Sequence, residues 1–318
     1  MAGEAYGHVP VLAGPALEWL RVKPEGLYVD CTAGAGGHAE LIAQRLAGGR
    51  LIALDRDPGA VAAVRRRLAQ YPNVTVVHAN YGELETVLAP LGVAQVDGVL
   101  LDVGVSSVQL DDPARGFSFQ VPGPLDMRMD TTSVLDAAGY LAQATEDGLV
   151  EVLRSYGDVR PARRIARALI ARRNAGCLNS TRDVVEAVQE ALNISGHVPE
   201  EVRTVFQALR MAVNEELKWL EAGIAQALGL LAPDGRLVVI AFHSGEDRVV
   251  KQAFAWAARR QRLFHADGRV KTVLEPAFKL LTPKPVVADP DEVRRNPRAK
   301  SAKLRAIERI ARGAETVS

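Results

Sequence analysis

Residues 30–38, DCTAGAGGH, are the most informative stretch of this chain for its fold. They continue a short apolar run, LYVDCT at 27–32, and lead into a stretch of helical character at 39–47. Glycine lets a backbone turn sharply and approach a ligand without a clash at Cβ, and the first turn of a helix has N–H groups without partners inside the helix. The stretch therefore predicts a ligand-binding turn between a strand and a helix, although glycine-rich turns also serve purely structural purposes.

The segments that follow extend this unit into a sheet. Runs rich in Val, Leu and Ile recur at 51–55, 74–79 and 98–103 and lack strict alternation. Such runs, separated by helical stretches, are typical of parallel strands buried on both faces. A loop rich in Gly, Pro and Asp and then helical patterns follow, until strand character returns at 237–242. The predicted fold class is α/β, a Rossmann-like sheet interrupted by an inserted all-helical domain.

These patterns also predict the domain boundaries. We expect a discontinuous ligand-binding domain at 1–107 and 212–288, with the inserted helical domain at 108–211. Residues 289–318 are rich in Arg and Lys and are expected to form a basic C-terminal tail.

Composition limits the classes of protein that fit. The only cysteines are Cys31 and Cys177, which excludes a disulfide framework or a cysteine-rich zinc site and favours a reducing cytoplasm. The N-terminus lacks the layout of a signal peptide, and no apolar run approaches the ~20 residues that span a bilayer. We expect a cytoplasmic protein without a metal cluster. Because the net charge is only +1, any surface for nucleic acid must be local.

Polar side chains follow three of the other predicted strands. Asp55 ends the second strand, Tyr81 follows the third, and Asp102 ends the fourth. The carboxyl ends of parallel strands meet in one crevice. There Asp55 could accept hydrogen bonds from ribose hydroxyls, Tyr81 could stack on adenine, and Asp102 could pair with an ammonium group. Taken alone, Tyr81 is better read as an ordinary half-buried aromatic. The set as a whole favours S-adenosylmethionine over a dinucleotide, since the glycine loop departs from G-x-G-x-x-G.

At this point the chain resembles the MraW family, also called the ribosomal RNA small subunit methyltransferase H family. The segments that carry the resemblance are HVPVL at 8–12, the glycine loop at 30–38, DRD at 55–57, LDVGVSSVQLD at 101–111, RGFSF at 115–119, GPLDMRMD at 123–130, YG at 156–157, FQALR at 206–210, FHS at 242–244 and NPRAKSAKLR at 296–305. The chain departs from the family pattern in having Ala241 before Phe242 and Gly245 after Ser244.

The resemblance implies a class I methyltransferase that moves a methyl group from S-adenosylmethionine to N4 of a cytidine. The cytidine would lie in the decoding region of small-subunit (16S) ribosomal RNA, within an assembled or assembling subunit. For His38 the implied contact is through its backbone N–H. The cofactor contacts that the resemblance implies fall on Gly36, Gly37, His38, Asp55, Tyr81, Asp102 and Gln109.

Four further side chains are hypothetical contacts to the substrate because they follow strand ends. They are Ser106, Ser107, His243 and Ser244. The alternative is that the serines cap helices or turns.

A track for the RNA backbone is predicted from clustered cations. Arg160, Arg163, Arg164 and Arg167 have helical spacing and share one face. By itself such a stripe is better read as a solvated surface. Together with the tail it predicts an RNA clamp. The tail cations are Arg294, Arg295, Arg298, Lys300, Lys303 and Arg305.

Two other classes of function remain as alternatives. A nicotinamide-dependent oxidoreductase could use the same fold, but the third glycine and a hydride-transfer constellation are missing. A non-catalytic RNA-binding module is disfavoured because Gly36, Asp55 and Asp102 all stand where a cofactor would need them.

Overall fold

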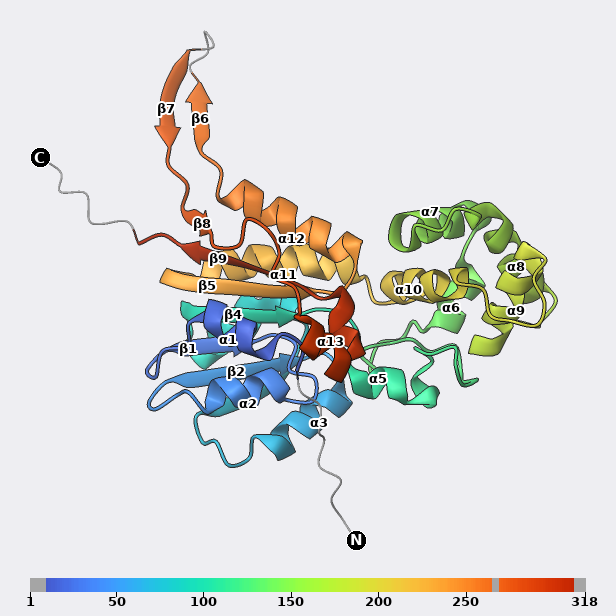
Figure 1. Cartoon of the computed structure of the whole chain (residues 1–318), viewed down its shortest axis with the longest axis horizontal. Helices are drawn as coiled ribbons and strands as arrows, with labels where there is room; N and C mark the ends of the chain where they lie inside the picture. Colours follow the sequence, from blue (N-terminus) through green and yellow to red (C-terminus); the bar gives the residue numbers. More distant parts are fainter. Residues whose placement is uncertain (1–9, 265–268, 312–318) are drawn as a thin grey trace, which may run out of the picture. The chain divides into compact units, whose positions relative to one another are not determined.

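The computed structural model describes residues 10–264 and 269–311 (Figure 1). The chain divides into two compact units. The first comprises Met1–Gly104 and Leu217–Ser318, and the second comprises Val105–Glu216. Among the described residues, no helix is both long and apolar enough to cross a membrane.

The first unit is built on a seven-stranded sheet of order β3-β2-β1-β4-β5-β9-β8. Its strands are β1 (Leu27–Asp30), β2 (Arg50–Asp55), β3 (Val74–His78), β4 (Val96–Asp102), β5 (Leu231–Ala241), β8 (Phe278–Leu280) and β9 (Lys303–Arg309). The strands β1 to β5 run parallel, and β9 is antiparallel to both β5 and β8. The predicted α/β fold class is confirmed.

Helices cover both faces of this sheet (Figure 1). They are α1 (Ala13–Leu20), α2 (Gly37–Ala43), α3 (Pro58–Arg67), α4 (Leu84–Leu88), α11 (Glu216–Leu230), α12 (Ser244–Ala257) and α13 (Pro290–Arg295). Alternate strand residues enter two separate cores: Ile52 and Leu101 pack on the α11 side, and Leu51 and Leu100 on the α1 side. Burial on both faces explains why these strands lack a polar alternation.

The described part of the C-terminal segment differs from the predicted tail. It contains α13, the short 3-10 helix η4 (Pro297–Ser301) and β9. Leu304, Ala306 and Ile307 are fully buried. Arg305 on the same strand is also buried, and its Nε lies 2.6 Å from Oδ1 of Asp247. The prediction that Arg305 belongs to an RNA clamp is therefore wrong, because its charge is neutralised inside the first unit.

Other tail cations are also engaged. Nζ of Lys303 lies 3.5 Å from Oδ2 of Asp247, and Arg294 pairs with Asp291 within α13. The cationic sequence at 303–305 is therefore part of a strand, β9, and both of these cations pair with Asp247 on α12.

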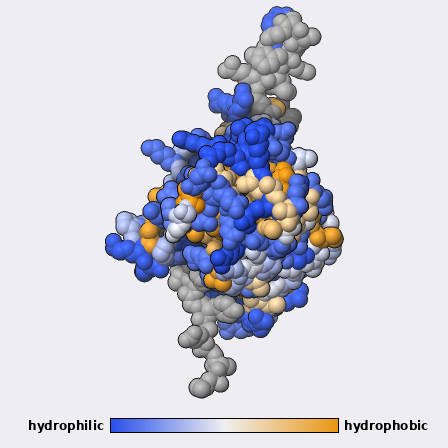
Figure 2. Space-filling model, turned by 90° about the vertical axis from the view of Figure 1, so that its right-hand side faces the viewer, coloured by the Kyte–Doolittle hydropathy of each residue, from blue (hydrophilic) through white to orange (hydrophobic). Residues whose placement is uncertain are grey.

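The second unit is helical and has a core of its own. Its helices are α5 (Ser107–Asp111), α6 (Ala137–Gln143), α7 (Glu146–Gly157), α8 (Ala162–Asn174), α9 (Thr181–Leu192) and α10 (Glu201–Val213). Arg163, Arg164 and Arg167 of the predicted stripe lie on α8, where Ile165 and Leu169 are buried. Arg160 precedes the helix, so its predicted helical spacing to the other three is wrong. Figure 2 turns the right-hand side of Figure 1 toward the viewer and shows a mostly hydrophilic face with small, separate hydrophobic patches.

The arginines of α8 are partly paired within this unit. Arg163 contacts both Glu146 and Asp147, and Nε of Arg167 lies 2.9 Å from Oε1 of Glu146. Exposed pairs of this kind contribute little to stability. Arg163 and Arg167 remain at the surface in these pairs, which agrees with the interpretation of the stripe as a solvated surface.

Candidate cofactor-binding site

The glycine loop connects β1 to α2 and is tied to the end of β2. The N–H of Ala33 donates to the carbonyl of Leu54 (2.9 Å), and the N–H of Gly34 donates to Oδ2 of Asp55 (2.7 Å). Gly34 and Gly36 have φ values of 54° and 84°, in the left-handed region that favours glycine. A Cβ on Gly36 would also lie 3.0 Å from Cδ of Arg67. The local conformation thus requires glycine at these two positions.

Asp55 performs a structural task that the sequence did not reveal. Its Oδ1 accepts the N–H of Asp57 (2.8 Å), so both carboxylate oxygens hold backbone groups. Burial raises the pKa of Asp55 to about 6, although these two N–H donors act in the opposite direction. Each oxygen retains a second lone pair that can accept a ribose hydroxyl.

Asp30 is a buried carboxylate that was not predicted as a site residue. Its Oδ1 accepts the N–H of Thr32 (3.2 Å), while Oδ2 has no hydrogen-bond partner within the described part of the chain. Burial, and to a lesser extent the charge of Asp55, raises the pKa of Asp30 to about 7. The signal that could have identified it is an acidic residue directly before a glycine loop.

Asp102 lies on the neighbouring strand, where Leu100 pairs with Asp30. The backbone N–H of Asp102 donates to Oγ1 of Thr32 (2.6 Å). Its Oδ1 is buried, and no described residue forms a hydrogen bond with it. Burial, together with the charges of Asp30 and Glu246, raises the pKa of Asp102 well above its usual value.

His38 contacts Asp102 without forming an ion pair at neutral pH. Its Nδ1 lies 3.7 Å from Oδ2 of Asp102. Burial lowers the pKa of His38 to about 4, so the ring is neutral at pH 7. Its Nε2 is another buried atom that lacks a hydrogen-bond partner among the residues the structure describes.

These orphaned atoms fit a cationic ligand. A buried carboxylate oxygen without a donor is costly, and native proteins rarely leave one unsatisfied. Asp30 and Asp102 each present such an oxygen on adjacent strands. A ligand that carries an ammonium group and a sulfonium would supply both hydrogen-bond donors and positive charge.

Tyr81 begins the 3-10 helix η1 (Tyr81–Glu83) after β3, and its ring packs against α11. A Cβ added to Gly223 would lie 2.6 Å from Cδ2 of Tyr81, which shows how closely the ring approaches the helix. The ring is buried, with 9% of the residue exposed. Tyr81 therefore packs in the core as an ordinary aromatic residue does. Its contact to adenine stays a prediction.

The end of β5 is organised by Glu246, which sequence reasoning missed. This residue is 2% exposed, and its Oε2 accepts the N–H groups of Phe242 (2.8 Å) and His243 (3.2 Å). In return, Nδ1 of His243 accepts the N–H groups of Gly245 (3.2 Å) and Glu246 (3.3 Å). The pair forms a reciprocal cap on α12, and a Glu three residues after a capping residue is the signal that could have identified it.

This cap limits what His243 can do. A ring nitrogen that accepts two N–H donors carries no proton itself. The other nitrogen, Nε2, lies 3.0 Å from Oε1 of Glu246. The structure therefore uses His243 to hold the turn. Ser244, the first residue of α12, is exposed.

Ser106, Ser107 and Gln109 lie in the second unit, where Ser106 directly precedes α5 and the other two are on that helix. Oγ of Ser106 accepts the N–H of Gln109 (3.2 Å), and Oε1 of Gln109 accepts the N–H of Ser106 (3.0 Å). The alternative that a serine caps a helix is thus confirmed for Ser106. Ser107 is the first residue of α5, the helix that Ser106 caps. A contact from Gln109 to the cofactor stays a prediction.

Comparison with known proteins decides the family. A model of the MraW methylase family matches residues 5–310. The chain belongs to this family. It is 46% identical over 314 residues to the ribosomal RNA small subunit methyltransferase H of Heliobacterium modesticaldum, covering 96% of this chain and 99% of that protein. It is 43% identical over 313 residues to the protein of the same name from Chromobacterium violaceum, covering 98% of each.

Membership confirms the predicted family and, with it, the S-adenosylmethionine-dependent class of methyltransferase. It argues against a nicotinamide-dependent oxidoreductase. The buried carboxylates of Asp30 and Asp102 fit the positive charges of that cofactor.

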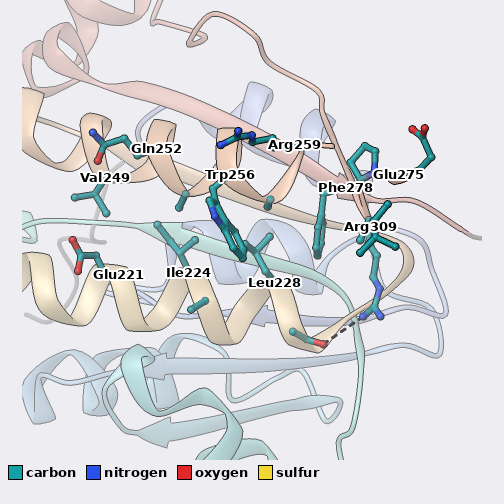
Figure 3. A pocket seen from close by; sticks show the side chains of 17 residues that line it. Glu221, Ile224, Leu228, Val249, Gln252, Trp256, Arg259, Glu275, Phe278 and Arg309 are labelled. Carbon is teal, nitrogen blue, oxygen red and sulfur yellow. Dashed lines mark hydrogen bonds between the residues drawn. The ribbon is translucent and has the colours of Figure 1, made fainter. Parts of the chain in front are cut away.

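This MraW-family methylase has a cavity between α11 and α12 (Figure 3). It encloses about 740 Å³ and is lined mainly by apolar side chains, among them Ile224, Leu228 and Phe278. Arg309 closes one end and donates to the carbonyl of Gly229. None of the predicted site residues lines this cavity.

Proposed function

We propose that this methylase transfers a methyl group from S-adenosylmethionine to N4 of a cytidine in the decoding region of small-subunit ribosomal RNA. The substrate would be an assembled or assembling small subunit in the cytoplasm. Similarity over nearly the whole chain to relatives named for small-subunit ribosomal RNA supports the class of substrate. The N4 target rests on the motifs that the sequence shares with the family.

The observation that carries the proposal is the pair of unpartnered carboxylate oxygens on adjacent strands. Asp102 would hold the ammonium group of the methionine moiety, and Asp30 would add negative charge behind it. Asp55 would accept the ribose hydroxyls, while Tyr81 would contact the adenine. Gly36, Gly37, His38 and Gln109 complete the proposed set of contacts.

When bound, S-adenosylmethionine supplies an electrophilic methyl group on a sulfonium. The exocyclic amine of cytosine is a weak nucleophile because its lone pair is delocalised into the ring. The chain must therefore align the amine with the methyl group, and alignment of this kind can account for a large part of a rate enhancement. Ser106, Ser107 and Ser244 are proposed contacts to the substrate. His243 is proposed to hold its turn in place, since its Nδ1 is occupied by two N–H donors.

The experiment uses small ribosomal subunits that lack their native methylation, radiolabelled S-adenosylmethionine and analysis of the labelled nucleoside. We expect N4-methylated cytidine. Asp102→Asn keeps the shape of the side chain but removes its charge, and it should weaken binding of the cofactor at least tenfold. Asp234→Asn is the matched control, because Asp234 is exposed and has φ 61°, a conformation that asparagine tolerates.

The outcomes separate the parts of the proposal. Label on another atom or nucleoside of the ribosomal RNA would refute the N4 assignment but would still support ribosomal RNA as the substrate. Tight cofactor binding without label in RNA would refute the substrate, and unchanged binding by Asp102→Asn would refute the role of Asp102.

A further inference from the structure

Helix α12 carries an exposed aromatic side chain that the cofactor site does not use. Trp256 is 68% exposed, the largest exposed fraction of any aromatic side chain among the described residues. In Figure 3 its ring extends from α12 toward α11, on the side where Leu228 lies. The cavity described above therefore has a flat aromatic surface in its opening.

Two exposed cations lie near this ring. Arg248 is on α12, eight residues before Trp256, and Arg259 follows the end of the helix and lines the same cavity as Trp256. Neither has an ion-pair partner in the described part of the chain.

The acidic residues of α12 do not offset that charge. Glu246 is buried in the helix cap, and Asp247 is engaged by Arg305 and Lys303. At the rim of the cavity, Glu275 pairs with Arg260, which leaves Glu221 on α11 as the acidic side chain facing this surface.

An exposed aromatic ring among unpaired cations fits single-stranded nucleic acid. Bases stack on aromatic side chains, while cations follow the phosphate backbone. The core of a protein–protein interface is instead depleted of charged residues. The observations on α12 therefore favour RNA over a protein partner.

The helix also leads away from the proposed reaction site. It begins at Ser244, directly after the turn that Glu246 holds at the end of β5. Trp256 follows twelve residues later, which corresponds to about 18 Å along the helix axis. Stacked nucleotides are about 3.4 Å apart along a strand, so this distance corresponds to about five nucleotides.

We propose that the exposed face of α12 binds single-stranded RNA that flanks the target nucleotide, with a base stacked on Trp256 and phosphates near Arg248 and Arg259. The proposal rests on the proposed function, because it assigns a further part of the same RNA substrate to a surface of the first unit.

The test measures binding of a 12-nucleotide single-stranded RNA by quenching of tryptophan fluorescence. The wild-type protein should show quenching, because a stacked base lies against Trp256. Trp256→Ala should lose that quenching and bind about tenfold more weakly or worse, as expected for the loss of one stacked base. Trp256→Phe should retain most of the affinity, because phenylalanine still provides a ring for stacking.

Charge is tested with a matched pair of variants. Arg248→Ala should reduce the slope of log affinity against log salt by about 0.7, because one phosphate contact is lost. Arg66→Ala removes an exposed cation on α3 and should leave both affinity and slope unchanged. Thermal denaturation checks that all variants fold, and we expect this because Trp256 and Arg248 are exposed.

The proposal is overturned if wild-type protein shows no quenching or if Trp256→Ala binds the RNA as tightly as wild type. The proposal is also overturned if Trp256→Ala raises the KM for ribosomal subunits but leaves the affinity for RNA unchanged. That result would identify a protein partner for this surface. Failure of the proposed function is a different result, since it appears as missing methylation by the wild-type protein that still binds RNA through Trp256.

Discussion

At the scale of single residues, the site depends on charge that is buried before any ligand arrives. Asp30 is fully buried, and Asp102 has a buried oxygen without a hydrogen-bond donor. Their pKa values are raised because burial disfavours the ionised form. Burial makes the ionised carboxylates unfavourable when no ligand is bound. The same burial strengthens their attraction to a bound cation.

This burial predicts a pH dependence of stability for Asp30. Its pKa is about 7 in the folded protein and near 3.8 in the unfolded chain, so between these values the folded state binds more protons. The contribution of Asp30 to the free energy of unfolding therefore falls as pH rises from about 4 to about 7, and it stays low above that.

The measurement is chemical denaturation of wild type and Asp30→Asn at several pH values without cofactor. The asparagine variant should gain stability relative to wild type as pH rises, by at most a few kcal/mol, since one pKa unit corresponds to about 1.4 kcal/mol. Taking the difference cancels other groups, among them His38, whose lowered pKa has the opposite effect. A difference that is constant with pH would contradict the prediction.

At the scale of elements, caps and ties join segments that sequence patterns treat as separate. Asn214, directly after α10, is 7% exposed, and its Nδ2 donates to the carbonyl of Met127 (2.7 Å). Its Oδ1 accepts the N–H of Met129 (2.7 Å). These bonds lie inside the second unit and fix the loop at 123–130 against α10.

Asn214→Ala is expected to destabilise the second unit by about 2–4 kcal/mol, because buried backbone groups lose their partners. Asn179→Ala, at an exposed position, should change stability by less than about 1 kcal/mol. Urea denaturation measures both changes. Equal effects of the two substitutions would show that the tie to Met127 and Met129 contributes nothing.

At the scale of the whole molecule, the second unit has its own core. Leu153, Ile165 and Leu209 are fully buried there, in a cluster distinct from the two that flank the sheet. A unit with a separate core has what a domain needs to fold alone.

A fragment of residues 105–216 is therefore expected to be helical and to unfold cooperatively, as measured by circular dichroism during heating. Ile165→Asp in the same fragment should abolish that transition, because it places a charge in the core. A wild-type fragment without a cooperative transition would show that the second unit needs the first to fold.

The sequence alone determined the features that follow from local chemistry. The glycines of the loop at 30–38, the cap at Asp57 and the apolar runs of β1 to β4 depend on neighbours within a few residues. The fold class and the family follow from them. Among the site residues, the proximity of Asp55 to the glycine loop could also be predicted, because parallel strands end at one edge.

Which charges are buried, and which partners they find, depends on the tertiary structure. Arg305 and Asp247 are 58 positions apart, and no local pattern predicted that they would pair and bring β9 into the sheet. The buried, unpartnered oxygen of Asp30 and the exposed ring of Trp256 were likewise not predicted by any local pattern. Burial of a polar or aromatic group is set by everything packed around it, and those neighbours come from distant parts of the chain.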